Sequence, residues 1–184
     1  MKVLAVCGSA RKEGNTATLI REALAGAGAA DTEVVFVSEL VMSGCTGCRG
    51  CRKENATGCI VKDDLVGLYD AIKAADAIII GSPIYYGEVT GQTKCFMDRW
   101  YALRDKDRIL RMPEGKKWAF LLVQGAEGSE HYAHTASRLR RIMQAYGMDA
   151  EVMVFPGLEE KGAAKGAEDA LERAHKAGAR LAGD

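Results

Sequence analysis

The sequence has no excess of charge of either sign. Lysine and arginine together number 25, and aspartate and glutamate together also number 25. A chain without a broad field of one sign has no general attraction for nucleic acid or for an anionic membrane. We therefore expect neither of these as a partner.

Long hydrophobic runs are also missing. The longest, ADAIIIG, is far too short to cross a bilayer. The opening MKVLAVCGSA is interrupted at Gly8 and followed by polar RKEGNT, which favours a buried first strand over a signal peptide. We expect a cytoplasmic protein, and because cytoplasmic thiols are kept reduced, a framework of disulfides is disfavoured.

Short apolar runs alternate with stretches of helical periodicity. Strands are predicted at KVLAV, EVVFV, AIIIG, WAFLLV and EVMVF, and helices at about 16–29, 65–75, 92–104, 131–146 and 163–181. KDDL should begin the second helix, with Asp63 or Asp64 as its N-cap. This order predicts one α/β domain with a flavodoxin-like, five-stranded parallel sheet in the order 2-1-3-4-5 and helices on both faces.

Three loops should meet at the carboxyl edge of this sheet, where ligands of such folds bind. The first, GSARKEGNT, offers backbone N–H groups, hydroxyls and Arg11 to an anion. It has neither the G-x-G-x-x-G of dinucleotide sites nor the Lys-Ser/Thr of nucleotide triphosphatases, so a terminal monophosphate fits better; an ordinary capped turn is the alternative. The others are GSPIYYGEVTGQ, whose tyrosines would stack on a ring or pack in a loop or dimer contact, and QGAEGSE.

These motifs, in this order, resemble the iron-sulfur flavoproteins, a branch of the NADPH-dependent FMN reductase-like proteins of flavodoxin fold. The resemblance rests on GSARKEGNT, KDDL, ADAIIIGSPIYYGEVTGQTKCFMDRW and the compact cysteine stretch, over roughly 3–99 and more weakly to 128. It implies one FMN-binding domain over 1–184 with a cysteine cluster loop at 43–60. It also implies a homodimer or homotetramer, with TKCFMDRW in a helix that takes part in assembly.

The resemblance further implies a set of flavin contacts. The FMN phosphate would be held by Ser9, Arg11, Asn15 and Thr16. The isoalloxazine would be bordered by Pro83, Ile84, Tyr85, Tyr86 and Gly87, with Gly125, Ala126, Glu127 and Gly128 contributing from the third loop. The stretch PGLEEKGAAKGAE, near the C-terminus, is interpreted as either a lid or a mobile connection.

Four cysteines follow the spacing C-x2-C-x2-C-x7-C: Cys45, Cys48, Cys51 and Cys59. Structural zinc usually takes two separated pairs of ligands, whereas this tight run, interleaved with glycine, suits one [4Fe-4S] cluster. The resemblance supports the cluster; zinc and free, redox-reactive thiols are the alternatives. Cys7 and Cys95 are predicted to be buried structural residues. The 3 histidines are scattered, which favours surface or capping roles over ligation.

These features together predict an electron-transfer oxidoreductase. A carrier such as ferredoxin would feed the cluster, the cluster would feed FMN, and FMN would reduce a small acceptor. No residue is predicted to act as a general acid or base. The alternatives are an NAD(P)H-dependent FMN or quinone reductase with a structural, zinc-binding cysteine site, and a redox or iron sensor without turnover.

Overall fold

Five parallel strands form the centre of the structure, a computed structural model that describes residues 1–29 and 31–183. They are β1 (Lys2–Cys7), β2 (Asp31–Phe36), β3 (Ala77–Tyr85), β5 (Lys117–Val123) and β6 (Asp149–Phe155), in the order β2-β1-β3-β5-β6. The predicted flavodoxin-like order is therefore confirmed. A short strand, β4 (Glu88–Val89), turns back on the end of β3 as an antiparallel hairpin.

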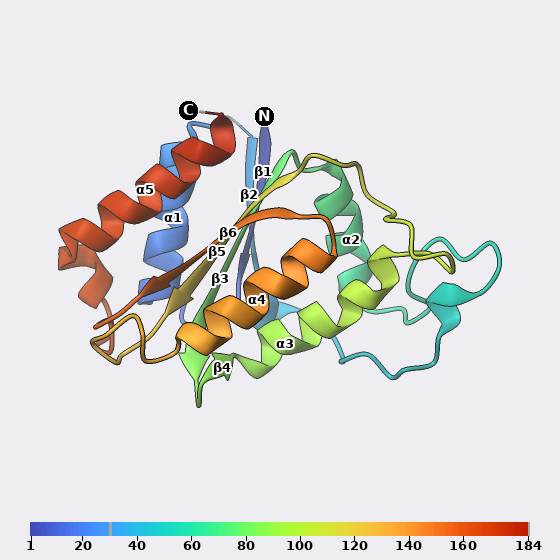
Figure 1. Cartoon of the computed structure of the whole chain (residues 1–184), viewed down its shortest axis with the longest axis horizontal. Helices are drawn as coiled ribbons and strands as arrows, with labels where there is room; N and C mark the ends of the chain where they lie inside the picture. Colours follow the sequence, from blue (N-terminus) through green and yellow to red (C-terminus); the bar gives the residue numbers. More distant parts are fainter. Residues whose placement is uncertain (30, 184) are drawn as a thin grey trace.

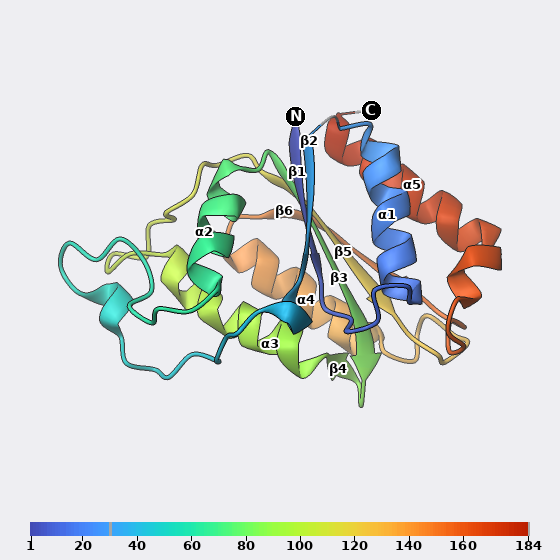
Figure 2. The same ribbon diagram turned by 180° about the vertical axis from the view of Figure 1, so that it is seen from behind.

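Helices cover both faces of the sheet (Figures 1 and 2). On one face lie α1 (Asn15–Ala27) and α5 (Glu168–Ala182), packed against each other. The opposite face carries α2 (Leu65–Ala74), α3 (Gly91–Asp98) and α4 (Ala133–Ala145). Four short 3-10 helices lie in the described connections: η1 (Val37–Glu39), η2 (Gly50–Arg52), η3 (Arg99–Leu103) and η4 (Ala163–Gly166).

Two hydrophobic cores follow from the alternation of side chains along the strands. In β1, Val3 and Ala5 face α1 and α5, whereas Leu4 and Val6 face the other helical layer. Both sets are fully buried, since each face of a parallel sheet is covered by crossover helices. This doubly covered sheet fixes the carboxyl ends of β1, β3 and β5, from which the predicted ligand loops leave.

Three predicted elements differ from the structure. The helix expected at 92–104 ends at Asp98 and tightens into η3, a turn that carries the buried Arg99 and Trp100. The helix expected at 163–181 is broken at Ala167, which has non-helical backbone angles between η4 and α5. Strand β2 begins at Asp31, earlier than the apolar run, because it is an edge strand whose first four residues are exposed.

No helix within residues 1–29 and 31–183 is both long enough and apolar enough to cross a membrane.

Candidate functional site

A cavity of about 340 Å³ opens where the loops after β1, β3, β5 and β6 meet. Its walls combine backbone and small polar groups from the first loop with apolar side chains from the others. A volume of this size is typical of small-molecule sites. The lining residues are Ser9, Arg11, Gly14, Asn15, Thr16, Pro83, Ile84, Tyr85, Val123, Gly125, Ala126, Tyr132, Leu158 and Glu159.

The N-terminus of α1 points at this cavity with its first-turn N–H groups uncapped. Gly14 is the N-cap, and no side chain in the described part of the chain accepts a hydrogen bond there; the first turn holds no acidic residue. A Cβ at Gly14 would lie 2.9 Å from Cβ of Arg11, so glycine permits the tight approach of the loop. Unpaired N–H groups and the helix dipole favour an anion at this position.

The side chain of Asn15 joins the start of α1 to the segment after β6. Its Nδ2 donates to the carbonyl oxygens of Leu158 (2.9 Å) and Glu160 (2.8 Å), and its Oδ1 accepts from the N–H of Ala164 (3.1 Å). The amide is thus fully engaged with the segment after β6. Only the backbone N–H of Asn15 is left for a ligand, and the segment 158–164 is fastened to α1.

A cluster of buried hydroxyls holds the β3–β4 hairpin beneath the cavity. Thr90 Oγ1 donates to the carbonyl oxygen of Gly8 (2.8 Å), and Ser82 Oγ accepts from the N–H of Thr90 (3.1 Å). These bonds join the end of β1 to the hairpin. At its tip Tyr86 adopts a left-handed φ of 51° and is fully exposed (106%).

The loop after β5 is shaped by Gln124. Its side-chain Nε2 donates to the carbonyl oxygens of Ala126 (3.0 Å) and Gly128 (2.7 Å). The N–H of Gly157 in turn donates to Ala126, so the loops after β5 and β6 support each other. A Cβ at Gly125 would lie 3.1 Å from Cβ of Glu159, which shows how closely the two backbones approach.

Nine of the predicted flavin contacts line the cavity together: Ser9, Arg11, Asn15, Thr16, Pro83, Ile84, Tyr85, Gly125 and Ala126. Tyr86, Gly87, Glu127 and Gly128 do not line it; Tyr86 lies fully exposed at the tip of the hairpin. Sequence reasoning missed Gly14, Val123, Tyr132, Leu158 and Glu159. The last two lie in the PGLEEKG stretch, where glycine after a strand was the available signal.

The four cysteines of the compact run lie in a long loop that extends sideways from the sheet (Figure 1, cyan to teal, on the right). All four line one small cavity of about 20 Å³ together with Arg99, Tyr101 and Ala102. Cys45 and Cys48 are exposed, Cys51 is buried and Cys59 is intermediate. Thiols that are separated by up to fourteen positions in the chain are thus gathered at one place on the surface.

A buried ion pair between Arg99 and Asp63 joins the two ends of this loop. Arg99 binds Asp63 through two hydrogen bonds of 2.8 and 3.1 Å and also donates to the carbonyl oxygen of Ser43 (3.0 Å). The side chains are 1% and 10% exposed. Burial acts to lower the pKa of Arg99 and to raise that of Asp63, but the hydrogen bonds of the pair outweigh it and shift both pKa values the other way.

The KDDL motif begins α2, as the sequence predicted, with one of its aspartates as the N-cap residue. Asp64 occupies the N-cap position without a side-chain cap, and its carboxylate accepts instead from the N–H of Val41 (2.7 Å). Asp63 is committed to Arg99 and to the N–H of Ser43 (3.4 Å). Both carboxylates therefore close the base of the cysteine loop.

Arg111 fastens the middle of the same loop. Its guanidinium donates to the carbonyl oxygens of Cys51 (3.0 Å) and Ala56 (2.7 Å) on the loop, and to those of Ala102 (2.9 Å) and Arg104 (2.6 Å) on the body. A single planar cation thus joins two backbone segments that share no regular secondary structure. It also places a positive charge close to the thiols.

The thiols differ in their readiness to ionise. A hydrogen bond from the N–H of Gly50 lowers the pKa of the exposed Cys48, whereas burial raises the pKa of Cys51. The donor set of four thiols and no carboxylate suits iron–sulfur or zinc. In the part of the chain that the structure describes, however, no three such side chains are close enough to form a preformed metal site.

Cys7 and Cys95 lie outside this set. Cys7 is fully buried in β1, as expected, and burial raises its pKa. Cys95 is only half-buried, contrary to the prediction. It lies on α3 beside the start of the cysteine loop, with its Sγ 3.7 Å from where a Cβ of Gly44 would be.

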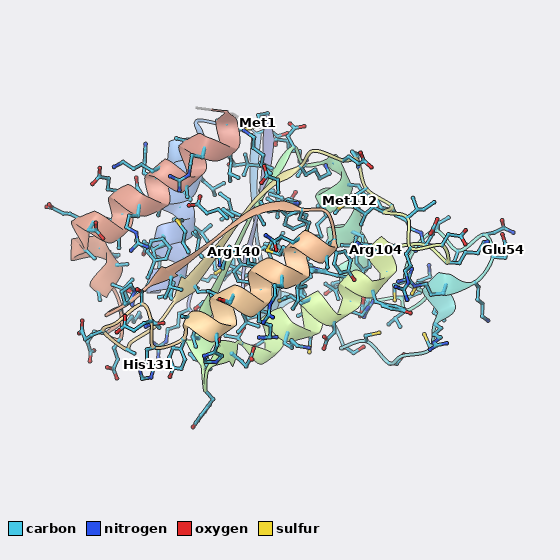
Figure 3. The ribbon with its side chains drawn as sticks, viewed as in Figure 1. Met1, Glu54, Arg104, Met112, His131 and Arg140 are labelled. Carbon is cyan, nitrogen blue, oxygen red and sulfur yellow. The ribbon has the colours of Figure 1, made fainter. Side chains whose placement is uncertain are left out.

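The two cavities have no lining residue in common. Glu54, in the cysteine loop, and His131, next to the cavity residue Tyr132, lie at opposite sides of the view in Figure 3. The loop leaves β2 at the ligand edge of the sheet but then runs along the α2–α3 side. Within one chain the thiols therefore do not join the wall of the larger cavity.

Comparison with known proteins identifies the architecture. The model of the family described as NADPH-dependent FMN reductase matches residues 1–157. The chain belongs to the NADPH-dependent FMN reductase family. The description of this family supports FMN as the cofactor.

The chain is similar to curated proteins named iron-sulfur flavoprotein, as the sequence motifs predicted. One from Methanosarcina thermophila is 34% identical over 150 residues, covering 80% of this chain and 75% of the relative. One from Methanocaldococcus jannaschii is 41% identical over 106 residues, covering 56% of this chain. The matched region spans only 54% of the length of that second relative.

Solved structures agree on the fold of this FMN reductase family member. The NAD(P)H:quinone oxidoreductase from Methanothermobacter marburgensis superposes with a TM-score of 0.78 at 17% identity, covering 98% of each chain. An archaeal flavodoxin gives a TM-score of 0.58 at 18% identity, covering 99% of this chain and 96% of its own. At these identities the likeness shows the flavodoxin-like fold.

Proposed function

We propose that this protein is an electron-transfer oxidoreductase that uses FMN and one [4Fe-4S] cluster. It would pass electrons from a carrier such as ferredoxin to a small acceptor. When bound, FMN supplies two-electron or one-electron chemistry and the cluster supplies one-electron chemistry. The observation that carries the proposal is the presence, in one chain of the FMN reductase family, of a flavin-sized cavity and a separate cavity lined by four cysteines.

The walls of the larger cavity suit FMN chemically, and we call it the flavin cavity from here on. The uncapped start of α1, with Ser9, Arg11 and Thr16, would bind the phosphate, and Asn15 would contribute its backbone N–H. Arg11 has no ion-pair partner among residues 1–29 and 31–183, so its charge is available. Pro83, Ile84, Tyr85, Gly125 and Ala126 would border the ring and exclude water from one side of it.

The cysteine loop fits a cluster by its donor set. Cys45, Cys48, Cys51 and Cys59 would be the ligands, and the thiol side chains would have to turn inward to ligate it. Arg49, Arg52, Lys53 and Arg111 would offset part of the negative charge of four thiolates. Arg99 and Arg111 hold the backbone at Ser43 and Cys51, so the ligands would be presented from a loop that is fixed at two points.

The separation of the two cavities supports an assembly of chains. Since they share no lining residue, we propose that a homodimer or homotetramer brings the cysteine loop of one chain toward the flavin cavity of another. The helix α3 and the segment after it, which carry TKCFMDRW, would take part in this contact.

Anaerobic purification followed by analysis of iron, sulfide, zinc and FMN tests the proposal. We expect about four irons and four sulfides per chain with one flavin, and bleaching of the flavin by reduced ferredoxin. Cys48→Ser should lose the cluster, whereas Cys95→Ser, a matched thiol outside the four, should retain it. Zinc without sulfide, or a flavin that ferredoxin cannot reduce in the cluster-loaded protein, would overturn the proposal.

A second candidate is an NAD(P)H-dependent FMN or quinone reductase with a structural cysteine site. Two observations favour it: the thiols do not form a preformed metal site within the described residues, and the chain is 28% identical over 135 residues to a putative NAD(P)H-dependent FMN-containing oxidoreductase of Bacillus subtilis. This relative covers 69% of the chain, and the match spans 68% of the relative. Rapid reduction of bound FMN by NADPH in iron-free protein would favour this function.

A further inference from the structure

A third cavity, of about 180 Å³, lies beside the cysteine loop and is lined by arginines and tyrosines. We call it the arginine cavity; its lining residues are Arg52, Tyr101, Arg104, Arg108 and Tyr146. They come from η2, from the segment 101–108 and from the end of α4, which meet near the labelled Arg104 in Figure 3. None of these residues lines the flavin cavity.

Two of the arginines are held in fixed orientations by stacking. The guanidinium of Arg52 lies 4.1 Å from the ring centroid of Tyr101, and that of Arg104 lies 4.4 Å from the ring centroid of Tyr146. Stacking covers the face of a guanidinium and leaves its N–H edge free. Two tyrosines therefore preorganise the donors of this cavity.

Most of those donors have no protein partner. Arg52 donates to the carbonyl oxygen of Asp105, and Arg104 to that of Ala145. Each guanidinium has five N–H donors, so these bonds leave the greater part of its capacity unused. The side chain of Arg108 makes no hydrogen bond to any residue in 1–29 or 31–183.

The positive charge of the cavity is also unbalanced. No acidic side chain lines it, and none of its three arginines forms an ion pair within the described residues. Asp105, which is close in sequence, uses Oδ1 of its carboxylate to accept from the N–H groups of Asp107 and Ile109, both at 2.9 Å. Three like charges gathered at one cavity repel one another, and a bound anion would remove that repulsion.

We propose that the arginine cavity is a binding site for an oxyanion, a phosphate or a carboxylate group, separate from the flavin site. Guanidinium edges match the oxygen pairs of both groups, and the cavity has room for the anion with a small organic part. The anion belongs either to a free metabolite or to an acidic side chain of a protein. Because Arg52 directly follows Cys51, the bound anion would contact the cysteine loop itself.

Calorimetric titration of the full chain tests the site, with saturating FMN present to occupy the flavin cavity. The probes are inorganic phosphate, succinate and a hexaglutamate peptide in low-salt buffer. We expect saturable binding that Arg108→Gln weakens about tenfold, the loss of one charge-assisted hydrogen bond. Lys165→Gln is the control, because it removes one exposed charge from η4, which lines neither cavity, and it should bind within about twofold of the parent.

The probes distinguish the source of the anion. Binding of phosphate or succinate that depends on Arg108 supports a small metabolite, and binding of the peptide alone supports an acidic protein. The proposal is overturned if none of the three binds, or if Arg108→Gln and Arg104→Gln both bind as the parent does. Since Arg108 makes no side-chain hydrogen bond within the described chain, its variant should fold, and an unchanged melting temperature checks this.

Discussion

The flavin cavity and the four-cysteine cavity are built in different ways. The first is formed by loops at the carboxyl edge of the parallel sheet, so the order of strands brings its walls together. The second lies on an irregular loop that extends beyond the sheet and is held by Arg99, Asp63 and Arg111. Topology positions one site, and a few buried side chains position the other. Their sensitivities to substitution should differ accordingly.

The largest effect is expected from Asp63→Asn. The substitution leaves the guanidinium of Arg99 buried without its countercharge, and breaking one side of a buried ion pair costs about 3–5 kcal/mol. Urea unfolding should show this loss, and amide exchange should quicken across 41–63. Glu151→Gln is the control: it breaks the exposed pair with Arg180 and should cost less than about 1 kcal/mol. Equal losses of unfolding free energy in the two variants would show that Arg99 and Asp63 do not form a buried ion pair in solution.

A smaller loss is expected from Arg111→Met, which keeps the aliphatic stem and removes the guanidinium. Four carbonyl oxygens lose their donor, and we expect a cost of about 2–3 kcal/mol, because solvent can reach some of them. Amide exchange should rise at 51–56 while FMN affinity stays unchanged, since the flavin cavity does not depend on this brace.

Arg140→Met is the matched control, because among the described residues its guanidinium donates only to the carbonyl oxygen of Val152. It should lose less than about 1 kcal/mol and leave exchange in the cysteine loop unaltered. A fall in FMN affinity in Arg111→Met would contradict the independence of the two sites.

Some features of the two sites could be predicted from the sequence and others could not. Strand order and the ligand edge follow from hydrophobic periodicity and the handedness of crossovers, so the loops containing Ser9, Pro83 and Gly125 could be placed together in advance. The cysteine spacing identified the second site for a similar reason, as local spacing is itself the signal. Both rest on information that is either periodic or contiguous in the chain.

The remaining features depend on contacts between distant, irregular segments. Nothing local marks Asp63 as the partner of Arg99, although KDDL correctly predicted the start of α2. The side-chain amide of Asn15 donates to carbonyl oxygens 143 and 145 positions away, and no local pattern marks these contacts. The exposure of Tyr86 depends on a two-residue turn that brings β4 back onto β3, and β4 is too short for periodicity to reveal.

Thr16→Val should weaken FMN binding about tenfold while leaving the cysteine loop unchanged. The substitution conserves volume and removes a hydroxyl at the uncapped start of α1, and one hydrogen bond to a charged phosphate accounts for that factor. Fluorescence quenching of FMN measures the affinity. Thr18→Val is the control, because its hydroxyl donates to the carbonyl oxygen of Gly14 (3.2 Å) and does not line the cavity. A loss of affinity as great in Thr18→Val would mean that Thr16 acts only through the helix.

The smallest expected effect is a pH dependence of the unfolding free energy that comes from Asp63 at the base of the cysteine loop. Burial alone would raise the pKa of Asp63, but hydrogen bonds from Arg99 and Ser43 hold this pKa below its ordinary value of 3.8. A carboxylate with a lowered folded pKa stabilises the protein above its unfolded pKa, and this contribution is lost as pH falls through the folded value. The difference in unfolding free energy between the parent and Asp63→Asn should therefore become smaller below about pH 4. It should fall by about 1.4 kcal/mol for each unit by which the pKa of Asp63 in the folded chain lies below its pKa in the unfolded chain.

Urea unfolding of both proteins at pH 7 and at pH 3 measures that gap. The protonated carboxyl of Asp63 resembles the amide of asparagine, so the two proteins become more alike in acid, while FMN affinity per folded molecule should show no matching difference between them. A gap as wide at pH 3 as at pH 7 would mean that Asp63 keeps the same protonation preference in the folded and unfolded chain. Arg99 and Asp63 would then stabilise the cysteine loop through packing rather than through charge. The four-cysteine cavity would no longer differ from the flavin cavity in depending on an ion pair.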